Sequence, residues 1–341
     1  MKKPLSLTLA LALLCGSLAA CSSNSAPAPA PAASSAEASV AADAASTEAA
    51  PAEAATEATT EAAAEEVDDT ADPVAVAAME YFENFPKMAD YGNNAIPSAD
   101  LFAKIDAEED MLIVDIRQAA DYAEGHLKGA VNIPYQDIPS YLEQIPDDKP
   151  VFVNCYSGQT SSQTVALLNI AGKYAVNIVS GWNGGISQTE GYEAYVETDE
   201  NTFDGADYPV DDAIKEAITA YYAEATSNNY ASFNFPPADL KELVDAESDA
   251  YTILSVRQAK DYDEGHIAGA INIPFGQGMQ AQFPSLPTDK PVIVYCYSGQ
   301  TASQVMAVLR MLGFEAYNLA GGMGASGKSG WLKEDYPVVT D

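Results

Sequence analysis

The sequence predicts an α/β fold, and it predicts that fold twice in tandem. Short β-branched apolar runs alternate with stretches of helical pattern along the chain. This alternation is typical of a mainly parallel sheet that is covered by helices on both faces. Residues 117–134 and 257–274 share thirteen of 18 positions, which indicates a duplication. Each copy spans about 130 residues, which is long enough to bury its own core.

Each repeat is expected to open with a short amphipathic helix, at residues 73–81 and 211–222. Buried strands should follow, separated by helices. The expected strands are Met111–Ile116, Val151–Val153 and Asn177–Val179 in the first repeat, and Ile253–Val256, Val292–Tyr295 and Asn318–Leu319 in the second. The expected helices include Asp100–Ala107, Gln163–Ala171 and Gln304–Leu312.

The amino-terminal segment is interpreted as a targeting segment and not as part of the fold. Lys2 and Lys3 precede an apolar run over residues 5–20, which is short for a membrane span and has the form of a secretory signal peptide. The run ends at Leu18-Ala19-Ala20-Cys21, which resembles the lipobox of bacterial lipoproteins. That resemblance implies cleavage before Cys21, lipidation of Cys21, and export to a membrane of the bacterial cell envelope. An ordinary secretory signal is the alternative.

Residues 22–72 hold no aromatic and no basic residue and are rich in Ala, Pro, Ser, Thr and Glu. Such a tract buries too little apolar surface to offset its chain entropy, so we expect a disordered tether. Its role is to lift the domains off the membrane or to span a cell wall. The predicted organisation is therefore a signal peptide (1–20), a lipidated Cys21 with its tether (21–72), a first domain (73–210) and a second domain (211–341).

The charge of the chain argues against several classes of binding partner. The net charge is −34, and the two domains remain strongly acidic without the tether. Since no basic stripe is present, binding to nucleic acid is not expected. Binding to anionic lipid headgroups by charge is not expected either. The sequence does not indicate a protein partner.

One hexapeptide, Cys-Tyr-Ser-Gly-Gln-Thr, occurs at residues 155–160 and again at 296–301. Each copy follows an apolar run and precedes a helix-like stretch, so each cysteine should lie where a strand ends and a helix begins. Helix amino termini favour the thiolate form of cysteine. Cys15 leaves with the signal, and a disulfide between equivalent strand ends of two domains is disfavoured by geometry. Cys155 and Cys296 are therefore the candidate nucleophiles.

The residues around these cysteines resemble the rhodanese family of sulfurtransferases. The resemblance covers about residues 73–341. It is carried by Asp115-Ile116-Arg117, Glu124–Leu127, Gly129–Pro134 and Cys155, and in the second copy by Arg257, Glu264–Ile267, Gly269–Pro274, Cys296, Gly321-Gly322 and Trp331.

The resemblance implies covalent sulfur transfer through a cysteine persulfide. The thiolate would take the outer sulfur of a donor such as thiosulfate, polysulfide or a persulfide, and then pass it to cyanide or a thiol. No cofactor and no metal are expected, because no ligands cluster at metal spacing. The loop residues expected to hold the substrate are Tyr156, Ser157, Gly158, Gln159 and Thr160, and Tyr297, Ser298, Gly299, Gln300 and Thr301.

The chain departs from the family pattern in two places. Thr160 and Thr301 stand where many small members have an arginine that would contact an anionic donor, which makes a neutral or protein-bound donor plausible. Ser255 stands where the first copy has Asp115, so the copies can differ in loop support or activity.

Other classes of protein share parts of these motifs. A Cys–His protease would use His126 and His266, but a turn with a hydrogen-bonded imidazole is favoured. A Cys-dependent phosphatase is excluded, because no arginine follows at its loop position. Binding of substrate anions by Arg117 and Arg257 is one interpretation, but structural bridges with Glu124 or Asp121, and with Glu264 or Asp261, are favoured. A non-catalytic envelope module, which binds a protein or senses redox state through its thiols, stays open.

Overall fold

The computed structural model describes residues 71–202, 205–325 and 329–340. The predicted signal peptide, Cys21 and nearly all of the predicted tether lie outside these residues. Among the residues that the structure describes, no helix combines the length and the apolar character that a membrane span requires.

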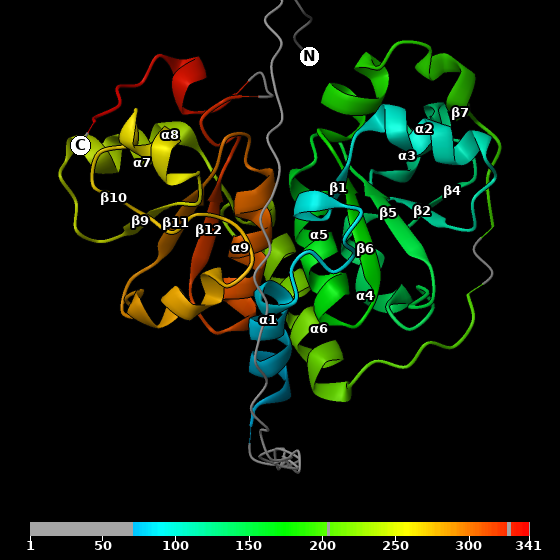
Figure 1. Ribbon diagram of the computed structural model, residues 1–341, viewed down its shortest axis with the longest axis horizontal. Coiled ribbons are helices and arrows are strands. Elements are labelled where there is room, and N and C mark those ends of the chain that lie inside the picture. The colour runs from blue at the N-terminus through cyan, green and yellow to red at the C-terminus, as the bar shows by residue number, and fades with distance from the viewer. Residues whose placement is uncertain (1–70, 203–204, 326–328, 341) are drawn as a thin grey trace, which may run out of the picture. The chain divides into compact units, whose positions relative to one another are not determined.

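Two five-stranded parallel sheets form the centres of the two repeats (Figure 1). The first has the order β1-β6-β5-β2-β4, and the second, read from the matching edge, has the equivalent order β8-β12-β11-β9-β10. This confirms the predicted α/β class. The strands are β1 Ala95–Ile96, β2 Leu112–Asp115, β4 Ala130–Asn132, β5 Pro150–Asn154, β6 Tyr174–Ile178, β8 Asn234–Phe235, β9 Thr252–Ser255, β10 Ala270–Asn272, β11 Val292–Tyr295 and β12 Ala316–Leu319.

Helices cover both faces of each sheet, as expected for parallel strands joined by crossovers. They are α1 Pro73–Glu83, α2 Ser98–Asp106, α3 Ala119–Glu124, α4 Ile138–Tyr141, α5 Gln159–Ile170, α6 Asp212–Ser227, α7 Pro237–Asp245, α8 Ala259–Asp263 and α9 Gln300–Met311. A short antiparallel pair, β3 His126–Leu127 with β7 Val196–Glu197, closes the first repeat, and a single bridge between His266 and Val339 takes its place in the second.

The predicted starts of two helices were wrong by about one turn. Helix α5 begins at Gln159 instead of Gln163, and α9 begins at Gln300 instead of Gln304. The polar first turns carry no apolar period, so the pattern did not reveal them. Gly158 and Gly299 precede the helices at φ of 84° and 82°, a left-handed conformation that glycine adopts readily. The cysteine loops are therefore shorter, and each cysteine lies closer to its helix.

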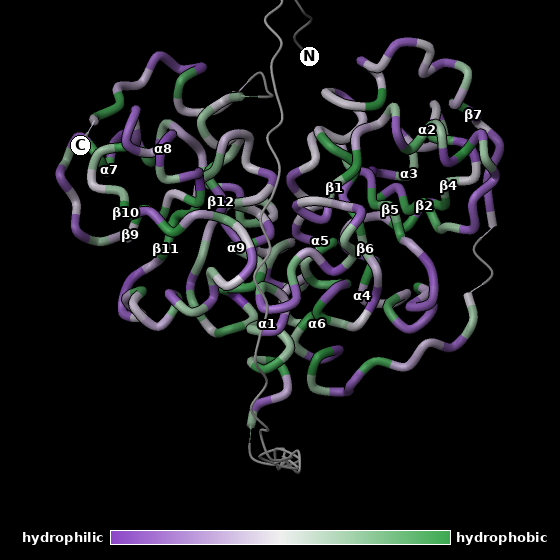
Figure 2. Tube along the Cα trace, in the orientation of Figure 1, coloured by the Kyte–Doolittle hydropathy of each residue, from purple (hydrophilic) through white to green (hydrophobic). Residues whose placement is uncertain are grey.

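The larger of two hydrophobic clusters extends through both repeats. Hydrophobic residues follow the central strands β5 and β11, while hydrophilic residues concentrate in the connecting loops (Figure 2). One buried cluster includes Val151 and Val165 of the first repeat together with Val292 and Val305 of the second. Helices α5 and α9 lie side by side within it (Figure 1). A smaller cluster fills the other face of the first sheet.

The helix that opens each repeat also packs against the other repeat. On α1, the ring of Phe82 contacts Phe275 and Phe283, at centroid distances of 5.6 and 5.9 Å. On α6, the hydroxyl of Tyr222 donates to Thr164 Oγ1 at 2.9 Å. The predicted sequence boundary between residues 210 and 211 stays a prediction, but these contacts show that the repeats share their opening helices.

Candidate active site

Each cysteine stands between the carboxyl end of a central strand and the amino terminus of a helix. Cys155 follows β5 and precedes α5, and Cys296 follows β11 and precedes α9. Both side chains are buried, with 2% and 1% of their surface exposed. The first-turn amides of a helix lack intrahelical acceptors and carry partial positive charge. Each sulfur therefore lies where negative charge is stabilised.

The two sulfur atoms share one kind of hydrogen-bond donor but differ in a second. The amides of Gly158 and Gly299 donate to Cys155 Sγ and Cys296 Sγ, each at 3.1 Å. In the first repeat, Ser161 Oγ also lies 3.1 Å from Cys155 Sγ. Residue 302, at the equivalent place in the second repeat, is alanine, and its side chain has no donor to offer. The sequence already contained this difference, but the structure places it at the sulfur.

The backbone of a second segment donates a hydrogen bond to the carbonyl of each cysteine. The amide of Trp182 donates to the Cys155 carbonyl at 2.7 Å, and the amide of Met323 donates to the Cys296 carbonyl at 2.9 Å. These segments approach closely because each contains a glycine with a left-handed backbone, Gly181 at φ of 57° and Gly322 at φ of 55°. A Cβ on Gly181 would lie 2.8 Å from the Gly158 amide nitrogen, closer than real Cβ atoms come. The two glycines are therefore part of the loop architecture.

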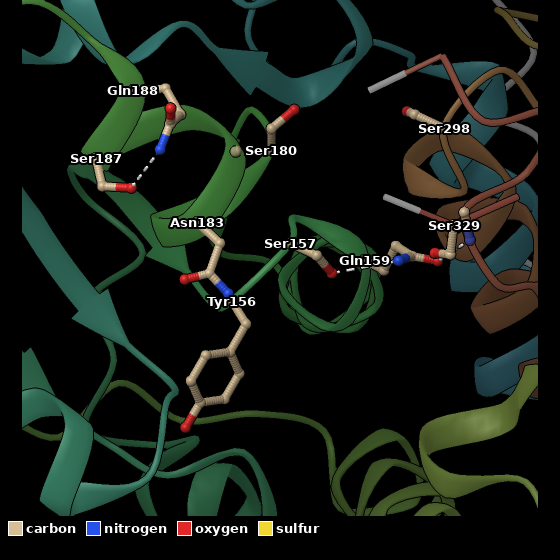
Figure 3. A pocket seen from close by; sticks show the side chains of 11 residues that line it. Tyr156, Ser157, Gln159, Ser180, Asn183, Ser187, Gln188, Ser298 and Ser329 are labelled. Atoms are coloured by element: carbon tan, nitrogen blue, oxygen red, sulfur yellow. Dashed lines mark hydrogen bonds between the residues drawn. The ribbon is translucent and has the colours of Figure 1, made fainter. Parts of the chain in front are cut away.

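Both repeats line one shared cleft of about 760 Å³. In Figure 3, Ser157 and Gln159 come from the first repeat, and Ser298 and Ser329 face them from the second. None of the described side chains that line the cleft is charged, since they are serine, glutamine, asparagine and tyrosine, together with glycine backbone. The lining residues are Tyr156, Ser157, Gln159, Ser180, Asn183, Gly184, Ser187, Gln188, Ser298, Gly321 and Ser329.

The tyrosine after each cysteine is fixed at the loop surface. The Tyr156 hydroxyl donates to Asp121 and accepts a hydrogen bond from the Gln118 amide at 3.1 Å. Tyr297 makes the same contacts with Asp261 and with the Gln258 amide. Partial burial, followed by the hydrogen bond to the neighbouring aspartate, raises the pKa of each phenol. Both tyrosines therefore stay neutral at physiological pH.

The loop glutamines reach across the boundary between the repeats. Gln159 Oε1 accepts hydrogen bonds from Asn318 Nδ2 at 3.0 Å and from the Gly321 amide at 2.9 Å. Gln300 Oε1 accepts from Asn177 Nδ2 at 3.1 Å and from the Ser180 amide at 2.9 Å. Each glutamine thus holds an asparagine side chain and a loop amide of the other repeat by hydrogen bonds. The sequence did not reveal this role.

The predicted partners of the two arginines were wrong. Arg117 pairs with Asp115 at 2.7 Å instead of Glu124 or Asp121, and its guanidinium lies 3.9 Å from the Trp182 ring centroid. Both charges are buried, and a buried arginine needs a carboxylate within reach. Residue 255 is a serine, so Arg257 lacks the equivalent of Asp115.

Arg257 donates instead to backbone carbonyls. Its partners are the Gly265 oxygen and the Asp261 backbone oxygen, each at 2.6 Å. Its Nε has no hydrogen-bond partner among the described residues. The predicted neighbour Asp261 is thus in contact, but through its backbone and not its carboxylate.

The two histidines are held inside turns. His126 is fully buried, and its ring nitrogens lie 2.8 Å from the Tyr122 carbonyl and 3.0 Å from the Asp199 carbonyl. His266 Nδ1 lies 3.0 Å from the Tyr262 carbonyl, and its ring stacks on Tyr262. Each Nδ1 is engaged by a carbonyl of its own turn, as the structural interpretation of the motif predicts, while Nε2 of His126 contacts the distant Asp199.

Of the predicted loop residues, Tyr156, Ser157, Gln159 and Ser298 line the cleft, whereas neither cysteine is among its lining residues. The segment from Ser180 to Gln188 lines the cleft, and sequence reasoning did not find it. Ser161, Asn177 and Asn318 were also missed. Asn177 and Asn318 are separated by 141 positions, the same offset as the two cysteines, and that retained pair was the available signal. Within the described ranges, no group of three or more His, Cys, Asp or Glu side chains could hold a metal ion.

Fold and site together define a pair of α/β domains, each with a thiol at the sheet's carboxyl edge. The chain belongs to the rhodanese-like domain family, because the model of that family matches residues 98–190 and 236–327, more than half of the chain. The relatives that it resembles include proteins named as sulfurtransferases.

Each curated relative matches about one domain. A sulfurtransferase of Allochromatium vinosum is 39% identical over 75 residues, which is 22% of this chain and 70% of the relative. The thiosulfate sulfurtransferase GlpE of Coxiella burnetii is 38% identical over 71 residues, which is 20% of this chain and 65% of the relative. In two relatives from Bacillus subtilis, the match covers 55% and 89% of their length.

Among solved structures, the 3-mercaptopyruvate sulfotransferase SseA of Escherichia coli is 18% identical to this chain. The match covers 66% of this chain and 98% of that protein, with a TM-score of 0.33. A likeness of this strength supports no inference about substrate.

Proposed function

We propose that the chain is a sulfurtransferase that carries sulfane sulfur on Cys155 and Cys296 as persulfides. The observation that carries this proposal is the repeated environment of the two thiols. Each follows a central strand, precedes a helix amino terminus and accepts a hydrogen bond from a glycine amide at 3.1 Å. Such a setting stabilises a sulfur anion, which is the nucleophile in sulfur transfer.

The proposed reaction has two displacements. In the first, the cysteine thiolate attacks the outer sulfur of a donor R–S–S⁻, an S–S bond forms on the enzyme, and R–S⁻ leaves with the electron pair of the broken bond. In the second, an acceptor thiolate or cyanide attacks the outer sulfur, and the cysteine thiolate leaves. No net oxidant or reductant is required, because sulfane sulfur passes between nucleophiles.

The cleft favours a donor of low charge. Its described lining residues are uncharged, and Thr160 and Thr301 supply no cation. The neighbouring Arg117 is already paired with Asp115. An anion such as thiosulfate would leave water without gaining a charged partner, which is unfavourable. We therefore propose a thiol-bound persulfide, whose sulfane group carries less charge than the thiosulfate dianion, as the preferred donor and a thiol as the acceptor.

A second candidate is a non-catalytic module that binds a protein or senses redox state through its thiols. The burial of both cysteines favours it, since a buried thiol is poorly accessible to a donor. Persulfide formation separates the two candidates, because a scaffold requires no sulfur loading.

The proposed location is the bacterial cell envelope, with a lipid on Cys21 as the membrane anchor. This rests on the apolar run that ends at Leu18-Ala19-Ala20-Cys21. Lipid chains on one residue would hold the protein stably, at about 0.8 kcal/mol for each buried methylene. Membrane fractionation with and without Cys21→Ser tests it, and the variant should move to the soluble fraction.

Peptide-level mass spectrometry of the full chain, after exposure to polysulfide or thiosulfate, tests the proposed activity. Each of the two cysteine peptides should gain about one sulfur atom, and cyanide or a thiol should remove it. Cys155→Ser and Cys296→Ser should each abolish loading on the changed peptide alone. Absence of loading with either donor would favour the non-catalytic candidate.

A further inference from the structure

Several buried residues around the two cysteines are equivalent, but one that lies against the sulfur differs. An offset of 141 positions relates Cys155 to Cys296, and Asn177 to Asn318. The same offset relates Ser161 to Ala302. All four of the non-cysteine positions are buried. At these positions the two sites differ by one hydroxyl, which Ser161 has and Ala302 lacks.

In the first repeat, a continuous line of hydrogen bonds reaches the sulfur from the opposite loop. The Ser180 amide donates to Gln300 Oε1 at 2.9 Å, which fixes the orientation of that side-chain amide. Asn177 must therefore present its NH₂ group to Gln300, at 3.1 Å, and its oxygen to Ser161 Oγ, at 2.6 Å. Ser161 Oγ in turn lies 3.1 Å from Cys155 Sγ.

In the second repeat, the corresponding line stops before the sulfur. Gln159 Oε1 accepts from the Gly321 amide at 2.9 Å and from Asn318 Nδ2 at 3.0 Å. The oxygen of Asn318 is buried and has no hydrogen-bond partner among the described residues. It is the atom that a hydroxyl at position 302 would satisfy, as Ser161 does for Asn177.

We propose that Ser161, oriented through Asn177 by Gln300 of the other repeat, is a positioning residue for Cys155, and that Cys155 is consequently the more reactive of the two thiols. The inference deepens the proposed function, because it assigns unequal roles to the two cysteines. It concerns the reactivity of the thiols themselves, so it can be tested without a sulfur donor.

The physical reason is the choice that one hydroxyl proton has between two acceptors. While Cys155 is protonated, Ser161 donates to the Asn177 oxygen. When Cys155 becomes a thiolate, the hydroxyl turns to the sulfur, because a hydrogen bond to an anion is about twice as strong as a neutral one. Cys296 keeps the Gly299 amide, and the alanine at position 302 offers it no such donor on ionisation.

The primary experiment is the rate of alkylation by iodoacetamide in the full chain, read for both cysteine peptides in the same sample. Ser161→Ala should slow alkylation of Cys155 by about tenfold, the size expected for losing a hydrogen bond to a charged group. Its pH profile should move to higher pH, and the Cys296 peptide should be unchanged. Ala302→Ser should accelerate alkylation of Cys296.

The role of the opposite loop is tested by a double-mutant cycle. Gln300→Ala should slow alkylation of Cys155 in the wild-type background but not in Ser161→Ala. Gln159→Ala is the matched variant of the other site. It should slow alkylation of Cys296 more in the Ala302→Ser background than in the natural chain, where residue 302 is alanine. Circular dichroism establishes that each variant is folded.

Three results would overturn the inference: equal rates for the two thiols in the unchanged chain, a Cys155 rate that stays the same or rises in Ser161→Ala, or an effect of Gln300→Ala that does not depend on Ser161. These outcomes are independent of the proposed activity. A chain that takes up no sulfur can still show the unequal alkylation, and a chain that loads both cysteines can still lack it.

Discussion

At the scale of single residues, glycine decides how close the supporting segment comes to each cysteine loop. Gly181 lies against the backbone of the first loop, where a Cβ would come within 2.8 Å of the Gly158 nitrogen and 2.9 Å of the Ser157 nitrogen. These neighbours are backbone atoms, which cannot rotate away. Gly172 has a similar left-handed backbone at φ of 86°, but open space surrounds it.

This contrast gives a residue-scale prediction. Gly172→Ala should lower the free energy of unfolding by about 1–2 kcal/mol, because only the left-handed backbone is strained. Gly181→Ala should lower it by about 1–3 kcal/mol more, because the added methyl group also overpacks the loop. Urea unfolding measures both variants. Sulfur loading on Cys155 should fall in Gly181→Ala alone, and equal destabilisation by the two changes would contradict the proposed packing.

At the scale of elements, the seam between the repeats holds several buried tyrosines. Tyr81 lies on α1, and Tyr221 and Tyr222 lie on α6. Their hydroxyls donate to Gln304, Gln163 and Thr164, so each phenol is satisfied while protonated. Burial raises the pKa of all three phenols, well above the usual range for Tyr221 and Tyr222.

These raised values predict unfolding in alkali. In the folded chain the buried phenols keep their protons at a pH where the unfolded chain has lost them, because the unperturbed pKa of tyrosine is about 10. The stability is therefore complete below about pH 10 and falls as the pH rises above it. The part of the tyrosinate absorbance that comes from the buried phenols should appear together with the loss of the circular dichroism signal above that pH.

Tyr222→Phe tests the assignment of this step to the seam. The variant loses the hydrogen bond to Thr164, so its stability at neutral pH should fall by about 1 kcal/mol. The pH at which half of the variant unfolds should nevertheless be higher than this loss of stability alone would give. The reason is that one fewer buried phenol must ionise. Tyr174→Phe, at an exposed site, is the control. Loss of the helical signal without an accompanying step in tyrosinate absorbance would argue against the seam.

At the scale of the whole described chain, the opening helices, which contact both repeats, connect them into one core. Phe82 on α1 is fully buried and contacts the rings of Phe275 and Phe283 in the second repeat. Helices α5 and α9 pack within the same cluster. A boundary crossed by so much apolar contact should make the repeats unfold together.

The two tryptophans, one in each repeat, allow a direct test. Trp182→Phe leaves Trp331 as the only tryptophan, and Trp331→Phe leaves Trp182. Urea unfolding followed by fluorescence should report each repeat separately, and the tryptophan signal should coincide with the circular dichroism transition in each variant. Phe82→Ala, added to either variant, should reduce stability by about 3–5 kcal/mol and keep this coincidence. Two resolved transitions would show that the repeats unfold independently.

Much of the architecture can be read from local pattern. The period of apolar residues located the central strands, and the duplicated hexapeptide located both thiols at strand ends. These features depend on neighbours along the chain, since burial of a strand and the turn at a glycine are encoded within a few residues. The polar first turns of α5 and α9 carried no such period, and the predicted helix starts were therefore late.

The sequence by itself determined two α/β repeats, the three central strands of each sheet and a cysteine loop in each, but not the edge strands β1, β4, β8 and β10. Only the tertiary structure decided which surfaces meet. It placed α1 against Phe275, paired Arg117 with Asp115 and extended Gln159 and Gln300 into the opposite sites. The physical reason is that these contacts join residues far apart in the chain and depend on how strands and repeats pack in space. They therefore produce no periodic pattern in the sequence.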